Sequence, residues 1–194
     1  MSTHAAPATL VPRQGLLADT GLVLGGTGLV AAAAQISVSL PFTPVPITGQ
    51  TFAVVLVGAA LGTVRGFASL FLYLWLGVAG APIYAHHNHG WSVVSSASGG
   101  YLVGFVLAAA FTGFMAERGH WDRRLSSSIS SMLTGNVIIY LVGLPWLAVV
   151  LNTNLEKTLE YGLYPFVPGD IFKLYLAAAL LPGAWRVVER VRRP

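Results

Sequence analysis

Cysteine is absent from this 194-residue chain, which excludes disulfide bridges and metal sites with thiolate ligands. Charge is scarce as well: Asp, Glu, Lys and Arg make up only 9% of the residues, against about 25% in an average soluble domain. The segments 20–64, 66–116 and 125–155 contain no charged residue. A Walker A glycine loop is also missing, so any ATP hydrolysis has to come from another protein.

The uncharged segments are strongly hydrophobic. Hydrophobic residues make up 55% of the chain, and its mean hydropathy is +0.69. One crossing of a bilayer takes roughly 20 apolar residues, so these segments have room for about five crossings. We predict a single integral membrane domain, residues 1–194. The pI of 9.7 does not indicate a nucleic-acid partner, because the basic residues lie at the ends of the apolar segments.

Glycine and proline divide the apolar segments into helices. After a tail at 1–18, interpreted as a retained cytoplasmic tail and not as a signal peptide, we expect an all-α protein. The second and third spans are short and are expected to form a tight hairpin around Thr63–Gly66. The six predicted transmembrane helices are 20–40, 50–64, 66–81, 99–116, 127–151 and 170–188.

Six crossings leave both termini on one side of the membrane. With both termini in the cytoplasm, Lys157 alone falls in an outer loop and Lys173 lies in the last span. The arginines then all face inward: Arg13, Arg65, Arg118, Arg123, Arg124, Arg186, Arg190, Arg192 and Arg193. This distribution follows the positive-inside rule and predicts a multi-pass protein of the cell (plasma or inner) membrane.

Three loops then face outward, at 41–51, 81–100 and 152–169, and all are rich in aromatic, amide and small residues. They are too apolar for ordinary solvated loops. Together with the outer ends of the spans they can close an apolar pocket with a few placed polar groups.

Asp170 and Lys173 interrupt the apolar stretch of the last predicted span. Three residues apart on a helix, they face the same way and can pair, and ionisable groups in a membrane segment usually face an interior cavity and serve function. In the alternative interpretation, Asp170 only caps the helix after Gly169 while Lys173 extends to the membrane surface. We favour a site for a ligand with both a carbonyl and N–H groups.

The sequence HHNHG offers imidazole ligands for a transition metal, from His86 or His87 together with His89. This loop contains no carboxylate or cysteine, so the ligand set is small for a metal site. The alternative is a polar turn around Asn88 and Gly90. Uptake of nickel or cobalt through the His86–His89 cluster is therefore the second functional hypothesis.

Ser98, in the sequence SASGG, raises a third hypothesis, an intramembrane hydrolase. A serine nucleophile needs a base within hydrogen-bond reach. No histidine lies in another predicted span, and His120 falls on the opposite, cytoplasmic side. We interpret the stretch as a flexible lead into the fourth span and expect no enzymatic activity.

The first span carries small residues four apart, Gly28 with Ala32 or Thr27 with Ala31. Such stripes let another helix approach closely. That helix belongs either to the same bundle or to a separate subunit, and the spacing does not distinguish the two.

Four sequence blocks, AQISVSLPFTPVPITGQT, GAPIYAHHNHG, SGGYLVGF and PGDIFK, resemble in their order the signature blocks of BioY, the biotin-binding S-component of energy-coupling factor (ECF) transporters. The resemblance covers about residues 34–173. It implies the S-component fold, high-affinity capture of biotin at the outer face, and no cofactor. It also implies a transmembrane coupling subunit and two cytoplasmic ATPases as partners. If the stripe of Gly28 and Ala32 contacts a separate subunit, it is the candidate interface to the coupling subunit.

The resemblance implies that Asn88, Asp170 and Lys173 supply the polar groups to the ligand, with Gln50 and Tyr101 as further members of the site. Biotin suits this set: Lys173 can donate to the ureido carbonyl, while Asp170 and the amide oxygen of Asn88 accept from the N–H groups. Aromatic side chains are expected to pack on its bicyclic body: Tyr84, Trp91, Tyr101, Tyr164 and Phe166.

One position departs from the family pattern. Some members carry an arginine directly after the GGY motif, a natural partner for the valerate carboxylate of biotin, and this chain has Leu102 there. Backbone N–H groups or a histidine of the 86–89 loop are the expected replacements.

Overall fold

The structure, a computed structural model, describes residues 15–119, 125–173, 175–176 and 180. Several expectations fall outside these ranges, including most of the predicted N-terminal tail, His120 and the end of the sixth predicted span. The same holds for most of the arginines behind the predicted orientation: Arg13, Arg123, Arg124, Arg186, Arg190, Arg192 and Arg193.

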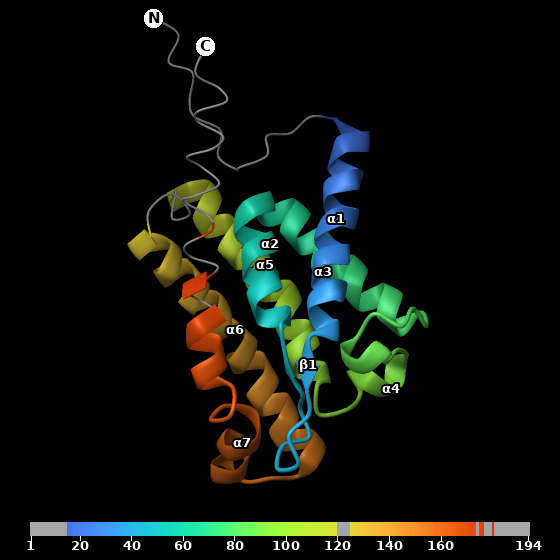
Figure 1. Cartoon of the computed structure of the whole chain (residues 1–194), viewed down its shortest axis with the longest axis vertical. Helices are drawn as coiled ribbons and strands as arrows, with labels where there is room; N and C mark the ends of the chain where they lie inside the picture. The colour runs from blue at the N-terminus through green and yellow to red at the C-terminus, as the bar shows by residue number, and fades with distance from the viewer. Residues whose placement is uncertain (1–14, 120–124, 174, 177–179, 181–194) are drawn as a thin grey trace, which may run out of the picture.

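Five long helices make up most of the described chain (Figure 1): α1 (Leu16–Gln35), α2 (Gln50–Leu61), α3 (Thr63–Val78), α5 (Gly99–Gly119) and α6 (Leu125–Leu151). Within the described residues, α1 and the greater parts of α5 and α6 are long and apolar enough to cross a bilayer, whereas α2 and α3 are apolar but shorter. These helices confirm the all-α class and correspond to the first five predicted spans.

Short helices occupy the predicted loops. The 3-10 helix η1 (Ala85–His87) and α4 (Trp91–Val94) lie between α3 and α5, and α7 (Leu155–Gly162) follows α6. A further helix begins at residue 167. We refer to its first part as the 167–173 segment; it is orange-red in Figure 1.

Helix α5 forms the centre of the bundle. It packs against α2, α3 and α6, and it is the most buried of the three long apolar helices. Its contact with α2 depends on Gly58, where a Cβ atom would lie 2.4 Å from the carbonyl oxygen of Ala109. A small residue at such a crossing lets two backbones approach closely, so the backbones of α2 and α5 are in direct contact here.

At the bundle end where α1 begins, α2 and α3 are joined through one residue, Gly62, whose φ of 86° suits glycine. The backbone N–H and the hydroxyl of Thr63 donate to the carboxylate of Glu117 on α5, at 3.1 and 2.6 Å. Arg65 forms an ion pair with Asp19 on α1. The predicted tight connection between the second and third spans is therefore present, but it lies at Gly62 and not at Thr63–Gly66, which form the first turn of α3. Charged side chains link α1, α3 and α5 here. We call this the Arg65 end.

At the other end of the bundle, the chain between α1 and α2 forms an antiparallel hairpin of β1 (Ser37–Val38) and β2 (Ile47–Thr48) (Figure 1). Helix α1 ends at Gln35, so the predicted end of the first span at residue 40 is too late. The reason is local, because β-branched residues on either side of a Pro-rich turn favour an extended chain. We call this the hairpin end.

Candidate functional site

A cavity of about 380 Å³ lies at the hairpin end. Its walls come from the hairpin, the start of α2, the 84–88 loop, α4, α5, α6 and the 167–173 segment. The volume suits a small organic molecule, because pockets for such ligands measure about 300–1,000 Å³. Seven of the residues predicted to contact a ligand line this cavity: Gln50, Tyr84, Asn88, Tyr101, Phe166, Asp170 and Lys173.

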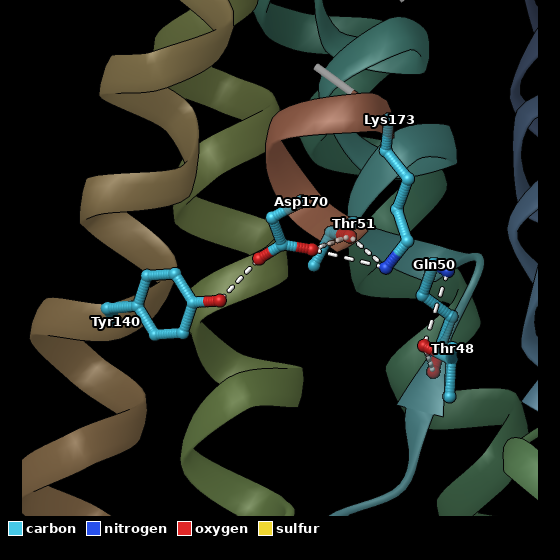
Figure 2. A network of polar contacts seen from close by, with 6 residues as sticks. All are labelled: Thr48, Gln50, Thr51, Tyr140, Asp170 and Lys173. Carbon is cyan, nitrogen blue, oxygen red and sulfur yellow. Dashed lines mark hydrogen bonds and ion pairs between the residues drawn. The ribbon is translucent and has the colours of Figure 1, made fainter. Parts of the chain in front are cut away.

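Asp170 and Lys173 form an ion pair in the wall of the cavity, with Lys173 Nζ 3.1 Å from Asp170 Oδ1 (Figure 2). Asp170 lies one turn into its helix, and its backbone N–H donates to Phe166 O at 2.8 Å. Its carboxylate contacts side chains of other elements and not the free N–H groups of the helix start. The predicted pairing is confirmed, and the cap interpretation of Asp170 does not fit this geometry.

Two residues that the sequence reasoning missed complete the arrangement around Asp170. Thr51 on α2 donates to Oδ1 at 3.1 Å, and Tyr140 on α6 donates to Oδ2. Figure 2 shows the carboxylate reaching Tyr140 with one oxygen and Thr51 and Lys173 with the other. Asp170 thus joins α2, α6 and the 167–173 segment. For Tyr140 the sequence does contain a signal, because it is the one tyrosine in the apolar 127–151 span. A buried tyrosine hydroxyl needs a hydrogen-bond partner.

Gln50 is buried in the cavity wall, and its carboxamide is engaged within the protein. Nε2 donates to the Tyr73 hydroxyl at 2.8 Å, and Oε1 accepts from Thr48 Oγ1 at 3.0 Å. Tyr73 in turn donates to Ile83 O at 3.1 Å. Gln50 therefore connects β2 to α3 and shapes the wall, while its amide offers little free capacity to a ligand.

Aromatic side chains form one apolar side of the cavity. The ring of Tyr101 stacks on Phe166, with centroids 6.4 Å apart, and meets Tyr140 edge-on at 6.3 Å. Its hydroxyl donates to Gly162 O at 2.9 Å, which fixes the ring. Tyr84 also lines the cavity and donates to Leu74 O at 2.6 Å. Burial raises the pKa of Tyr84 to about 12, so the phenol keeps this proton at neutral pH.

The remaining predicted residues differ in placement. Asn88 is exposed at the cavity mouth, and among the described residues its carboxamide has no hydrogen-bond partner. It is therefore free to meet a ligand. Trp91 is 63% exposed and does not line the cavity, and the same is true of Tyr164, which is 60% exposed. Of the predicted aromatic residues, Tyr84, Tyr101 and Phe166 line the cavity.

The described residues give little support to the metal and hydrolase hypotheses. Within that part of the chain, no group of three or more His, Cys, Asp or Glu side chains is close enough to hold a metal ion. Ser98 lines the cavity, but the ring nitrogens of His86 contact Ser37 and Ser39 and not Ser98. A hydroxyl without a base is a poor nucleophile.

The family model of BioY matches residues 4–190. The chain belongs to the BioY family. A biotin transporter BioY of Rhizobium etli is 34% identical over 149 residues, covering 74% of this chain and 79% of that protein. A biotin transporter BioY of Thermotoga maritima is 34% identical over 154 residues, covering 79% of this chain and 88% of that protein. The family that the four sequence blocks indicated is thereby confirmed.

A solved structure agrees at the level of the fold. The crystal structure of the S-component for biotin from an ECF-type ABC transporter superposes with a TM-score of 0.77 at 24% identity, over 92% of each chain. This BioY chain therefore has the S-component fold that the resemblance implied.

Proposed function

We propose that this BioY chain is a high-affinity biotin-binding subunit of an ECF transporter, with no enzymatic activity, that captures biotin at the outer face of the cell membrane. The observation that carries the proposal is the Asp170–Lys173 pair in the cavity wall. The relatives named as biotin transporters support the choice of ligand.

The hydrogen-bonding capacity of the pair leaves room for a ureido group. The ammonium of Lys173 has three donors, and it contacts Asp170 at 3.1 Å and Thr51 at 3.4 Å. The carboxylate of Asp170 has about four acceptor sites; Thr51, Tyr140 and Lys173 use three of them. One donor and one acceptor site remain, which match the carbonyl and one N–H of the ureido ring. Asn88 can accept from the second N–H.

The proposed topology has six transmembrane helices, with both termini in the cytoplasm and the hairpin end outside. Two arginines support it: Arg65 lies at the start of α3 and Arg118 at the end of α5. Both positions are at the bundle end opposite the cavity, as the positive-inside rule requires of a cytoplasmic end. A cavity at the opposite end is then open to biotin from outside.

Cysteine labelling of intact cells tests this topology. Because the native chain has no cysteine, a single cysteine reports only its own position. A cysteine at Asn88 is expected to react with a membrane-impermeant maleimide from outside, and a cysteine at Ser126 only after the cells are opened. Labelling of Ser126→Cys in intact cells would reverse the orientation and place the cavity on the cytoplasmic side.

The proposed partners are a transmembrane coupling subunit and two cytoplasmic ATPases, with α1 as the contact to the coupling subunit. Gly28 and Ala32 are exposed, and a Cβ atom at Gly28 would meet nothing within 4 Å. The inward face of α1 is a different one: Thr27 is buried and donates to Ser69 O at 2.9 Å. Of the two stripes in the sequence, the one at Gly28 and Ala32 is therefore available to a second protein.

Calorimetric titration of purified, dialysed protein tests the function. We expect saturable binding of biotin with a stoichiometry near one, and no heat from nickel or cobalt ions. Saturable binding of either metal without binding of biotin would refute the proposal and favour metal uptake.

A further inference from the structure

The loop between α3 and α4 carries two consecutive residues in the left-handed region, His86 and His87, each with φ of 58°. This conformation is uncommon outside glycine and persists where the surroundings hold it. Gln35, at the end of α1, holds it here. Its Nε2 donates to the carbonyl oxygens of Ile83 and Tyr84 at 3.3 and 3.2 Å, and its Oε1 accepts from the N–H of His87 at 3.1 Å.

The ring of His86 contacts hydroxyl groups of the β1 strand region. Nδ1 lies 3.1 Å from Ser37 Oγ, and Nε2 lies 2.9 Å from Ser39 Oγ. Both His86 and Ser39 line the cavity. A ring that carries its proton on Nε2, or on both nitrogens, donates to the oxygen of Ser39 and leaves the hydroxyl hydrogen of Ser39 free. The cavity therefore has a positioned O–H donor beside an imidazole.

Lys173 and His86 are the basic side chains among the described residues that line the cavity. Lys173 is paired with Asp170, whereas the ring of His86 has only hydroxyl partners in the described structure. In Figure 1 the green loop before α4 and the orange-red 167–173 segment lie on opposite sides of β1. The Lys173 ammonium contacts Thr51 on α2, whereas the His86 ring contacts Ser37 and Ser39 in the β1 region. A ligand that reaches both elements meets a charge pair at one and an imidazole without an acidic partner in the described structure at the other.

We propose that His86 and Ser39 form the subsite for the carboxylate of biotin. This inference rests on the proposed function and assigns the residues that recognise the acid group. Ser39 donates to a carboxylate oxygen, and His86 orients that hydroxyl and adds positive charge in its imidazolium form. Leu102, buried and apolar, contributes no such group. The subsite selects the free acid over neutral analogues of biotin.

The test compares biotin with biotinamide, in which a neutral amide replaces the carboxylate. Wild-type protein is expected to bind biotin more tightly than biotinamide. His86→Ala is expected to weaken the binding of biotin by about tenfold to a hundredfold, because a hydrogen bond to a charged group loses its orientation. It is expected to leave the binding of biotinamide unchanged. Ser39→Ala removes the donor without altering the histidine loop and is expected to have the same selective effect.

His87→Ala is the matched control, because His87 has the same φ of 58° but its side chain does not line the cavity. This variant is expected to keep the wild-type ratio of the two affinities. An unchanged ratio in both His86→Ala and Ser39→Ala overturns the subsite, whereas a wild-type protein that binds neither compound overturns the proposed function itself. The subsite is also overturned if His86→Ala weakens both ligands equally and Ser39→Ala has no effect. In that case His86 only stabilises the loop.

Discussion

Lys173→Met is expected to lower the affinity for biotin by roughly thirty-fold to several thousand-fold. Methionine keeps most of the apolar stem but removes the ammonium that would donate to the ureido carbonyl. It also leaves Asp170, which is 5% exposed, without its cation. Truncation of one partner of a buried charge pair costs about 2–5 kcal/mol, which corresponds to this loss of affinity. Titration calorimetry on the purified variant measures it directly.

Lys157→Met is the matched control, because Lys157 is an exposed lysine on α7 that does not line the cavity. We expect its affinity for biotin to equal that of the wild type. The melting temperatures of both variants are needed as well. A helix cap at Asp170 would predict a stability loss of about 1 kcal/mol and no change in affinity. If Lys173→Met lowers only the melting temperature, the assigned site is wrong.

Ala32→Trp is expected to abolish biotin uptake by cells while biotin binding to the purified subunit stays near the wild-type value. Ala32 is exposed on the face of α1 that turns away from the bundle, and it does not line the cavity. An indole at a close contact between helices separates the two backbones and removes their packing. Uptake of labelled biotin by cells that express the whole transporter, together with co-purification of the coupling subunit, measures the effect.

Leu141→Trp controls for bulk and for insertion into the membrane. Leu141 is 68% exposed on α6, a different helix, and it does not line the cavity. This variant is expected to transport normally. Equal loss of uptake in both variants would show that exposed tryptophan is not tolerated in these helices, and loss of biotin binding in Ala32→Trp would show that the Gly28 and Ala32 face belongs to the bundle.

Short-range patterns account for what the sequence predicted well. Apolar runs and glycine breaks gave the positions of α2, α3, α5 and α6 within a few residues. The spacing of Asp170 and Lys173 alone was enough to predict their pairing, because residues three apart on a helix face the same way. These features depend on residues close in sequence.

Contacts between distant residues could not be predicted in this way. Thr51 and Asp170 are 119 residues apart, and no periodicity in the chain indicates that α2 and the last helix meet at this carboxylate. Its aromatic ring made Trp91 a candidate to pack on the ligand, yet on α4 it is exposed and does not line the cavity. The orientation of a short helix depends on the packing of the whole bundle, which composition does not reveal.

The carboxamide of Gln35 has a consequence for local unfolding. It donates to Ala31 O in the last turn of α1 at 3.1 Å while it also holds the backbone of Ile83, Tyr84 and His87. Fraying of that helical turn and lifting of the loop over the cavity therefore break the same set of hydrogen bonds. The two events form one cooperative opening unit, so the end of a lipid-exposed helix and the rim of a binding cavity share a single free energy of opening.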